Sequence, residues 1–94
     1  MSADLQEKVN RYERLLDEAV SVAEPMPPKE SPLGRAAYEY LEMATSYLED
    51  GRHFLSDGDL VNALAAFSYG HGWLDAGARI GLFSVPRDGE LFTV

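Results

Sequence analysis

The chain has 94 residues, of which 46% are hydrophobic and ten are aromatic, so it can form one small folded domain and is too apolar to stay disordered. Sixteen acidic residues against eight basic ones give a net charge of −8, which disfavours direct binding to the phosphates of nucleic acid. The absence of cysteine excludes disulfides, thiolate metal sites and cysteine nucleophiles.

The start of the chain and its hydropathy predict a cytoplasmic protein with no membrane attachment. Residues 1–7 lack the basic and apolar pattern of a secretory signal, and no run approaches about 18 uninterrupted apolar residues. Only Lys8 and Lys29 are lysines, and carboxylates are in excess. This composition fits an ordinary acidic soluble protein, and it also resembles adaptation to a salt-rich, halophile-like cytoplasm.

The first predicted helix covers about residues 4–24, where apolar residues recur in steps of three and four. Asp4 with Glu7 three positions later fits a helix start, and Ser2 is an alternative cap. Residues 25–31 contain three prolines and predict a stiff connection. A proline-rich ligand for another protein's groove is the alternative interpretation.

The second predicted helix covers residues 32–56. Ser31 followed by Pro32 is a capping hydroxyl before a proline at the first helical position. Gly51 interrupts the helix, which costs about 1 kcal/mol unless a neighbour approaches closely, as we expect here. Residues 56–59 then combine a glycine stop with an aspartate start, so the second and third helices should form an antiparallel hairpin.

The third predicted helix, about residues 59–83, is the most apolar stretch, with no charge between Asp59 and Asp75. At about 100° per residue its large side chains fall on two nearly opposite faces, more than two companion helices can cover. Glycines along it allow close approach of another backbone, or else the helix bends or breaks at residues 70–72. These glycines are Gly70, Gly72, Gly77 and Gly81.

Residues 84–94 predict an irregular tail, because Pro86 ends any helix and a turn follows. Leu91, Phe92 and Val94 are unusually apolar for a chain end. We expect them either to cover the face of Tyr69, Trp73 and Ile80 or to dock on a neighbouring molecule. The whole sequence, residues 1–94, thus predicts a single all-α domain, a three-helix up-and-down bundle with this tail.

His53 and His71, the only two histidines, each have a carboxylate four positions away along the helix. In the hairpin the two histidines would lie about 13 Å apart along the helices, too far to share an ion, so no metal or other cofactor is expected. His71 is expected to bond to a tyrosine of the second helix. Ser68 lies on the same helix as His71 and has no preset third group, so no catalytic residue is expected either.

The third helix resembles the archaeal domain-of-unknown-function family 357. The resemblance rests on residues 63–77, which include Gly72-Trp73-Leu74-Asp75, and on Gly81-Leu82-Phe83. It extends to the first helix, the proline-containing joint and the tyrosine-rich second helix. The resemblance implies a three-helix bundle of archaeal origin, and it transfers no activity.

The preferred functional prediction is a non-enzymatic module that associates with itself, as a dimer, or with a protein partner. The predicted interaction residues are Tyr69, Trp73, Ile80, Phe83, Leu91 and Phe92. The alternative is an accessory domain that binds a small molecule or processes RNA in a cleft between the second and third helices. The predicted lining of that cleft is Tyr40, Tyr47, His71, Asp75 and Arg79.

Overall fold

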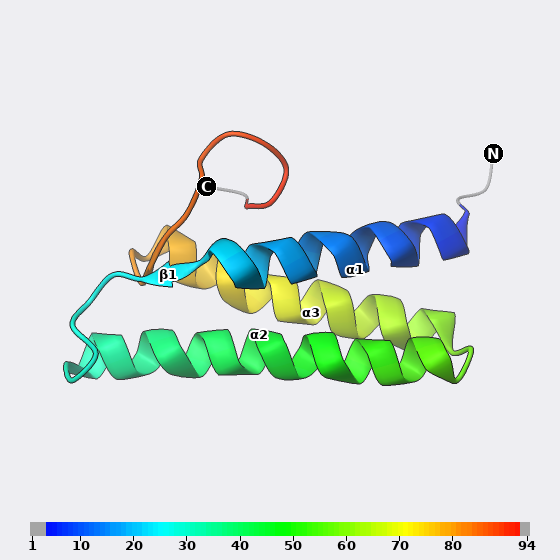
Figure 1. The fold of residues 1–94 in the computed structure, drawn as a ribbon, viewed down its shortest axis with the longest axis horizontal. Helices are drawn as coiled ribbons and strands as arrows, with labels where there is room; N and C mark the ends of the chain where they lie inside the picture. Colours follow the sequence, from blue (N-terminus) through cyan, green and yellow to red (C-terminus); the bar gives the residue numbers. More distant parts are fainter. Residues whose placement is uncertain (1–3, 93–94) are drawn as a thin grey trace.

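The computed structural model describes residues 4–92, and three helices make up most of this range. They are α1 (Leu5–Val22), α2 (Pro32–Ser56) and α3 (Leu60–Arg79). The helices run up, down and up, and α3 packs against both α1 and α2 (Figure 1). The predicted all-α three-helix bundle with an irregular tail is confirmed.

The helix starts follow the predicted capping residues. The Asp4 carboxylate accepts the backbone N–H of Glu7 at 3.1 Å, whereas Ser2 lies outside the described residues. The Ser31 hydroxyl accepts the N–H of Gly34 at 3.0 Å, so α2 has the predicted bounds. The first helix ends at Val22, two residues earlier than predicted, because the chain is already extended at Ala23.

Gly81 ends α3 four residues earlier than predicted. Its φ of +83° takes the chain out of the helix, and the Leu82 N–H then donates to the Gly77 carbonyl at 2.8 Å. Gly58, at φ +78°, closes α2 in the same way. The residues after Gly81 are therefore free to leave the direction of the helix.

Two short strands join the end of α1 to the end of α3, and the sequence did not predict them. Strand β1 (Glu24–Pro25) pairs antiparallel with β2 (Phe83–Ser84), and the Met26 N–H donates to the Leu82 carbonyl at 2.8 Å. We call this pair the β1–β2 clip. Each strand has only two residues, too few for an alternating pattern to appear. The clip fastens the proline-containing connection to the far end of α3.

The core lies between the three helices and depends on close approach at α2. Its largest fully buried side chains are Phe67, Leu16, Leu74 and Val9. A Cβ at Gly51 would lie only 2.3 Å from the Phe67 ring, so the missing side chain is what admits this ring. The third helix stays unbroken through residues 70–72, so the alternative of a break there is wrong.

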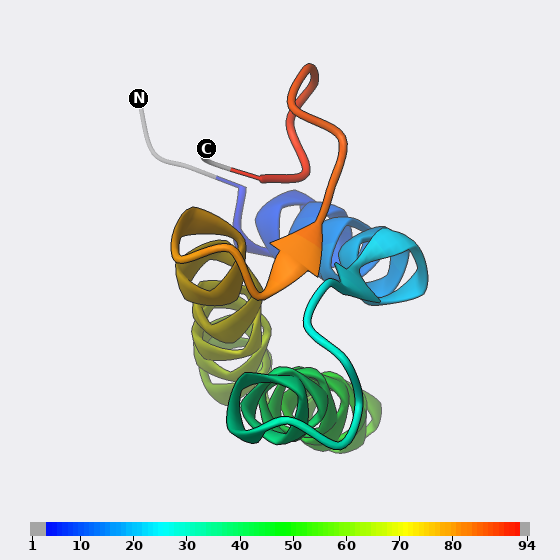
Figure 2. The same cartoon turned by 90° about the vertical axis from the view of Figure 1, so that its left-hand side faces the viewer.

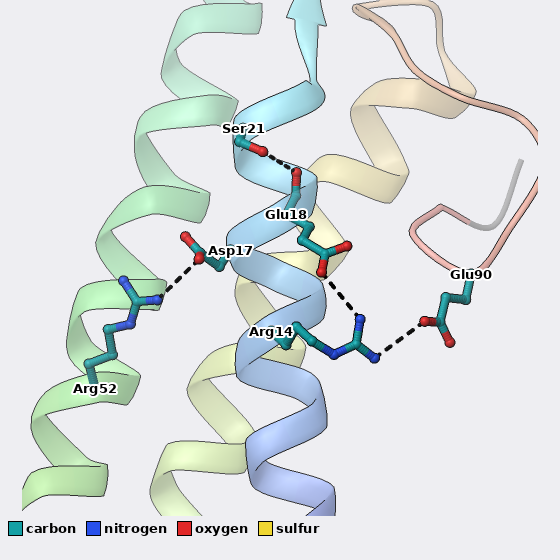
Figure 3. A network of polar contacts seen from close by, with 6 residues as sticks. All are labelled: Arg14, Asp17, Glu18, Ser21, Arg52 and Glu90. Carbon is teal, nitrogen blue, oxygen red and sulfur yellow. Dashed lines mark hydrogen bonds and ion pairs between the residues drawn. The ribbon is translucent and has the colours of Figure 1, made fainter.

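The tail lies over α1 and α3, on the side of the bundle away from α2 (Figure 2). Arg14 on α1 contacts Glu18 and Glu90 at 3.3 Å each, which ties the tail to the first helix (Figure 3). These carboxylates raise the pKa of Arg14 through hydrogen bonds. Val94 lies outside the described residues. The expectation that the tail covers Tyr69 and Ile80 is therefore wrong for its described part.

Arg52 makes a matching link from α2 to α1. Its guanidinium lies 2.8 Å from Glu13 and 3.5 Å from Asp17 (Figure 3 draws the second contact). The hydrogen bond that Arg52 donates to the Glu13 carboxylate is the main cause of the raised pKa of Arg52. None of the helices within residues 4–92 has an apolar stretch long enough to cross a lipid bilayer.

Candidate functional site

The outer face of α3 exposes large apolar side chains from one end of the helix to the other. Val61, Tyr69 and the adjoining Ile80 are 68%, 59% and 66% exposed. Tyr69 and Ile80 are eleven positions apart, about three whole turns, so they point in nearly the same direction, whereas Val61 is turned about 80° from Tyr69. The surplus of apolar surface predicted for this stretch is therefore present, and it is not covered within the described chain.

Tyrosines of α2 hold two aromatic rings of this face in place. The rings of Tyr47 and Tyr69 meet edge to face at 4.8 Å, and those of Tyr40 and Trp73 at 5.0 Å. Edge-to-face contacts stabilise aromatic pairs by about 0.5–1.5 kcal/mol beyond the area they bury. Trp73 is therefore half-buried beside α2, whereas Tyr69 stands between two hollows.

Two separate hollows lie between α2 and α3 and share Tyr69 as a lining residue, and we call them together the α2–α3 groove. They have volumes of about 300 and 260 Å³. The first is lined by Tyr40, Ser68, Tyr69, Gly72, Trp73 and Ala76. The second is lined by Tyr47, Asp50, Phe54, Asn62, Ala65, Ala66 and Tyr69. At about 1.5 Å per residue the α3 side of this groove is about 21 Å long.

His71 and Asp75 of α3 lie elsewhere, in a cavity between α1, α3 and the tail. This α1–α3 cavity has a volume of about 270 Å³. The His71 Nε2 donates to the carbonyl of Leu91, and its ring lies 6.1 Å from that of Phe92. The predicted bond from His71 to a tyrosine of α2 is therefore wrong, because this side of α3 faces α1. The cavity is lined by Tyr12, Leu15, Phe67, Ser68, His71, Gly72, Asp75, Glu90 and Leu91.

The structure does not assemble the predicted polar cleft between the second and third helices. Tyr40 and Tyr47 line the α2–α3 groove, whereas His71 and Asp75 line the α1–α3 cavity on the other side of α3. Arg79 is exposed in the last turn of the helix and lines neither hollow nor cavity. Successive residues of one helix diverge by about 100°, so a shared helix did not imply a shared site.

The predicted interaction residues also divide between surface and interior. Tyr69, Trp73 and Ile80 are at least partly accessible on α3. Phe83 and Phe92 are buried within the chain, and Leu91 is half-buried. Phe83 packs where Gly77 leaves room for its ring, and Phe92 closes the tail over α3. These two phenylalanines are thus part of the core and are not available as surface contacts.

Sequence reasoning missed several members of the α2–α3 groove. Asp50 is exposed on α2, and it lines a hollow together with Phe54 and Ala65. The helical period alone could have placed these residues on adjoining faces, but only the crossing of the helices decides which faces meet. Within residues 4–92 no three His, Asp or Glu side chains are grouped so as to hold a metal ion.

Comparison with known proteins places the chain in a family. A sequence model of the family described as "Protein of unknown function (DUF357)" matches residues 11–83, which include all of α2 and α3. No curated protein and no solved structure matches the chain. Because the match covers most of the sequence and confirms the resemblance seen in the third helix, the chain belongs to the DUF357 family of proteins of unknown function.

Proposed function

We propose that the protein is a non-enzymatic interaction module whose α2–α3 groove receives an amphipathic helix of a protein partner. One observation carries this proposal: Tyr69 is 59% exposed at the centre of a groove with a hollow on each side. A groove of about 21 Å matches about four turns of helix. Helix-in-groove binding uses such spaced apolar contacts.

The energetics favour binding at this surface. Burial of a large apolar side chain contributes about 1.5–3 kcal/mol. Tyr69 is available for it within the groove, whereas Val61 and Ile80 are exposed outside the lining of either hollow. Contacts with α2 already restrict Tyr69 and Trp73, so a partner would lose little conformational entropy in ordering them. Tyrosine and tryptophan in this setting are the residue types that dominate binding energy at interfaces.

A catalytic role has less support. His71 contacts the tail, and the tyrosines of the proposed cleft lie across α3 from it. Ser68, His71 and Asp75 do line one cavity, but the His71 Nε2 is already engaged by the Leu91 carbonyl. The net charge of −8 also argues for a protein partner over RNA.

A photoreactive cross-linker tests the proposal. A benzophenone side chain is placed at Tyr69, in the groove, or at Tyr38, which is 43% exposed on the opposite face of α2. Both variants are irradiated in a lysate of cells that naturally produce the protein. We expect discrete protein adducts at position 69 and none at position 38, because only the first position lies where a partner helix would bind.

The mass of each adduct then identifies the partner as a second copy or as a different protein. Adducts of equal yield at both positions, or no adduct at position 69, would overturn the proposed function. The comparison of positions 69 and 38 controls for non-specific cross-linking at an exposed tyrosine position.

A further inference from the structure

We infer that the helix received by the α2–α3 groove carries basic residues along the flank that faces α2. This inference rests on the proposed function and specifies the chemistry of the partner. It follows from the placement of an acidic row beside the apolar hollows.

The acidic row consists of Glu39, Asp50 and Asp57. These residues lie eleven and seven positions apart, and at about 100° per residue each step returns to within about 20° of the same direction. Asp50 lines a hollow of the groove, which fixes the side of α2 on which the row lies. All three side chains are exposed. The row therefore runs along the outer edge of the groove for about 27 Å.

No lysine or arginine lies in this row, and the exposed His53 is turned about 40–60° away from it. Between Arg35 and Arg52, α2 carries four carboxylates and no base. Arg52 itself points to α1, where it contacts Glu13 and Asp17. The row thus presents uncompensated negative charge beside a surface that is otherwise apolar.

The α3 side of the groove is uncharged. Its lining consists of alanine, glycine, serine, asparagine and aromatic residues, with no ionisable acid or base other than the tyrosine hydroxyl. One flank of a bound helix would therefore face carboxylates, and the other would face neutral side chains. Complementary charges of this kind speed association and exclude partners of the wrong charge.

A second copy of this chain fits the groove poorly. Two grooves placed face to face with their α2 helices together would oppose two acidic rows, and like charges oppose association. Of the bases of α1, Arg11 contacts Glu7, Arg14 contacts Glu18 and the tail, and Lys8 lies over the ring of Tyr12. The net charge of −8 also keeps two copies apart, so the occupant is a different protein.

Two synthetic peptides provide the test. Each has about 18 residues, a leucine face and no tryptophan, with lysine on one flank in the first peptide and glutamate there in the second. Trp73 is the only tryptophan of the chain and lines a hollow, so its emission reports binding to the full-length protein. We expect the lysine peptide to shift this emission to shorter wavelength, with an affinity that falls as salt rises. The glutamate peptide should bind at least about tenfold more weakly.

Matched charge variants separate the acidic row from the general negative charge. Glu39→Gln/Asp50→Asn and Glu42→Gln/Glu49→Gln each remove two exposed carboxylates from α2, but only the first pair lies beside the groove. We expect the first double variant to weaken binding of the lysine peptide about three- to tenfold and the second to leave it within about twofold. Equal effects of the two variants would overturn the inference.

Three other results would also overturn it: no binding of the lysine peptide, equal binding of both peptides, or a dimer in sedimentation of the protein alone that Tyr69→Glu abolishes. The last result would leave the proposed function standing, since the groove would still bind a helix. A lack of position-specific cross-linking would instead overturn the proposed function itself. The two failures are thus distinguishable.

Discussion

At the residue scale, Gly51 and Gly72 have opposite roles although both lie within helices. Gly51 is buried, and a Cβ there would lie 2.3 Å from the Phe67 ring. Gly72 is exposed and has no heavy atom within 4 Å of the place a Cβ would occupy. The first glycine is required by packing, whereas the second has no packing role within the described chain.

Alanine at these two positions should therefore change stability in opposite directions. We expect Gly51→Ala to lower the free energy of unfolding by about 1–3 kcal/mol, because the buried Phe67 ring has little room to move. Gly72→Ala should raise it by about 0.8–1 kcal/mol through helix propensity. Urea unfolding monitored by circular dichroism measures both. A stable Gly51→Ala protein would show that the ring adapts without cost.

Single residues also mark the limit of prediction from sequence. A close neighbour at Gly51 could be predicted because an interior glycine is costly, but its identity as Phe67 could not. The carbonyl partner of His71 was equally inaccessible, since Leu91 lies twenty positions away and no local pattern connects them. Local chemistry predicts that a group needs a partner, and the fold decides which one.

At the scale of elements, local signals gave the helix starts correctly and the helix ends less well. Ser31 with Pro32 and the joint at Gly58 act through neighbouring residues, so α2 has its predicted bounds. The end of α1 adjoins the β1–β2 clip, which joins segments distant in sequence, whereas α3 ends at the local turn of Gly81. The position of the tail likewise depends on the space that α1 and α3 leave between them. Such non-local contacts explain why the groove and cavity linings were not predicted.

The tail should contribute measurable stability through Phe92, which is 6% exposed. We expect Phe92→Ala to lower the free energy of unfolding by about 1.5–3 kcal/mol, the value of burying such a side chain. Hydrogen exchange at residues 87–92 should become faster. Ile80→Ala, at an exposed apolar position, should change stability by less than about 0.5 kcal/mol. Equal effects of the two substitutions would mean that the tail is not bound in solution.

At the scale of the whole molecule, repulsion among carboxylates opposes folding. Sixteen acidic residues face eight basic ones, and the ion pairs of the described chain are all on the surface. Exposed pairs contribute only about 0.2–1 kcal/mol each. The hydrogen bond to Glu13 raises the pKa of Arg52 further above its ordinary, strongly alkaline value, so its charge and its link to α1 do not change near neutral pH.

Added salt should therefore stabilise the protein. The screening length falls from about 10 Å at 0.1 M to about 3 Å at 1 M, which weakens the repulsion among many charges more than it weakens a few close pairs. Thermal unfolding in potassium chloride should show a melting temperature that rises with concentration. Choline chloride should give a similar rise if screening is the cause. A falling melting temperature would mean that the ion pairs outweigh the repulsion.

The β1–β2 clip also bears on how the chain assembles. The α2–α3 hairpin has a short joint and can form from neighbouring sequence, whereas the clip requires residues 24–25 to find residues 83–84. The first helix should therefore dock last, when the strands pair. Once they have paired, α1 cannot leave the bundle and exchange with the α1 helix of a neighbouring molecule unless the strands separate. A fastening of four residues thus guards the fold against domain swapping.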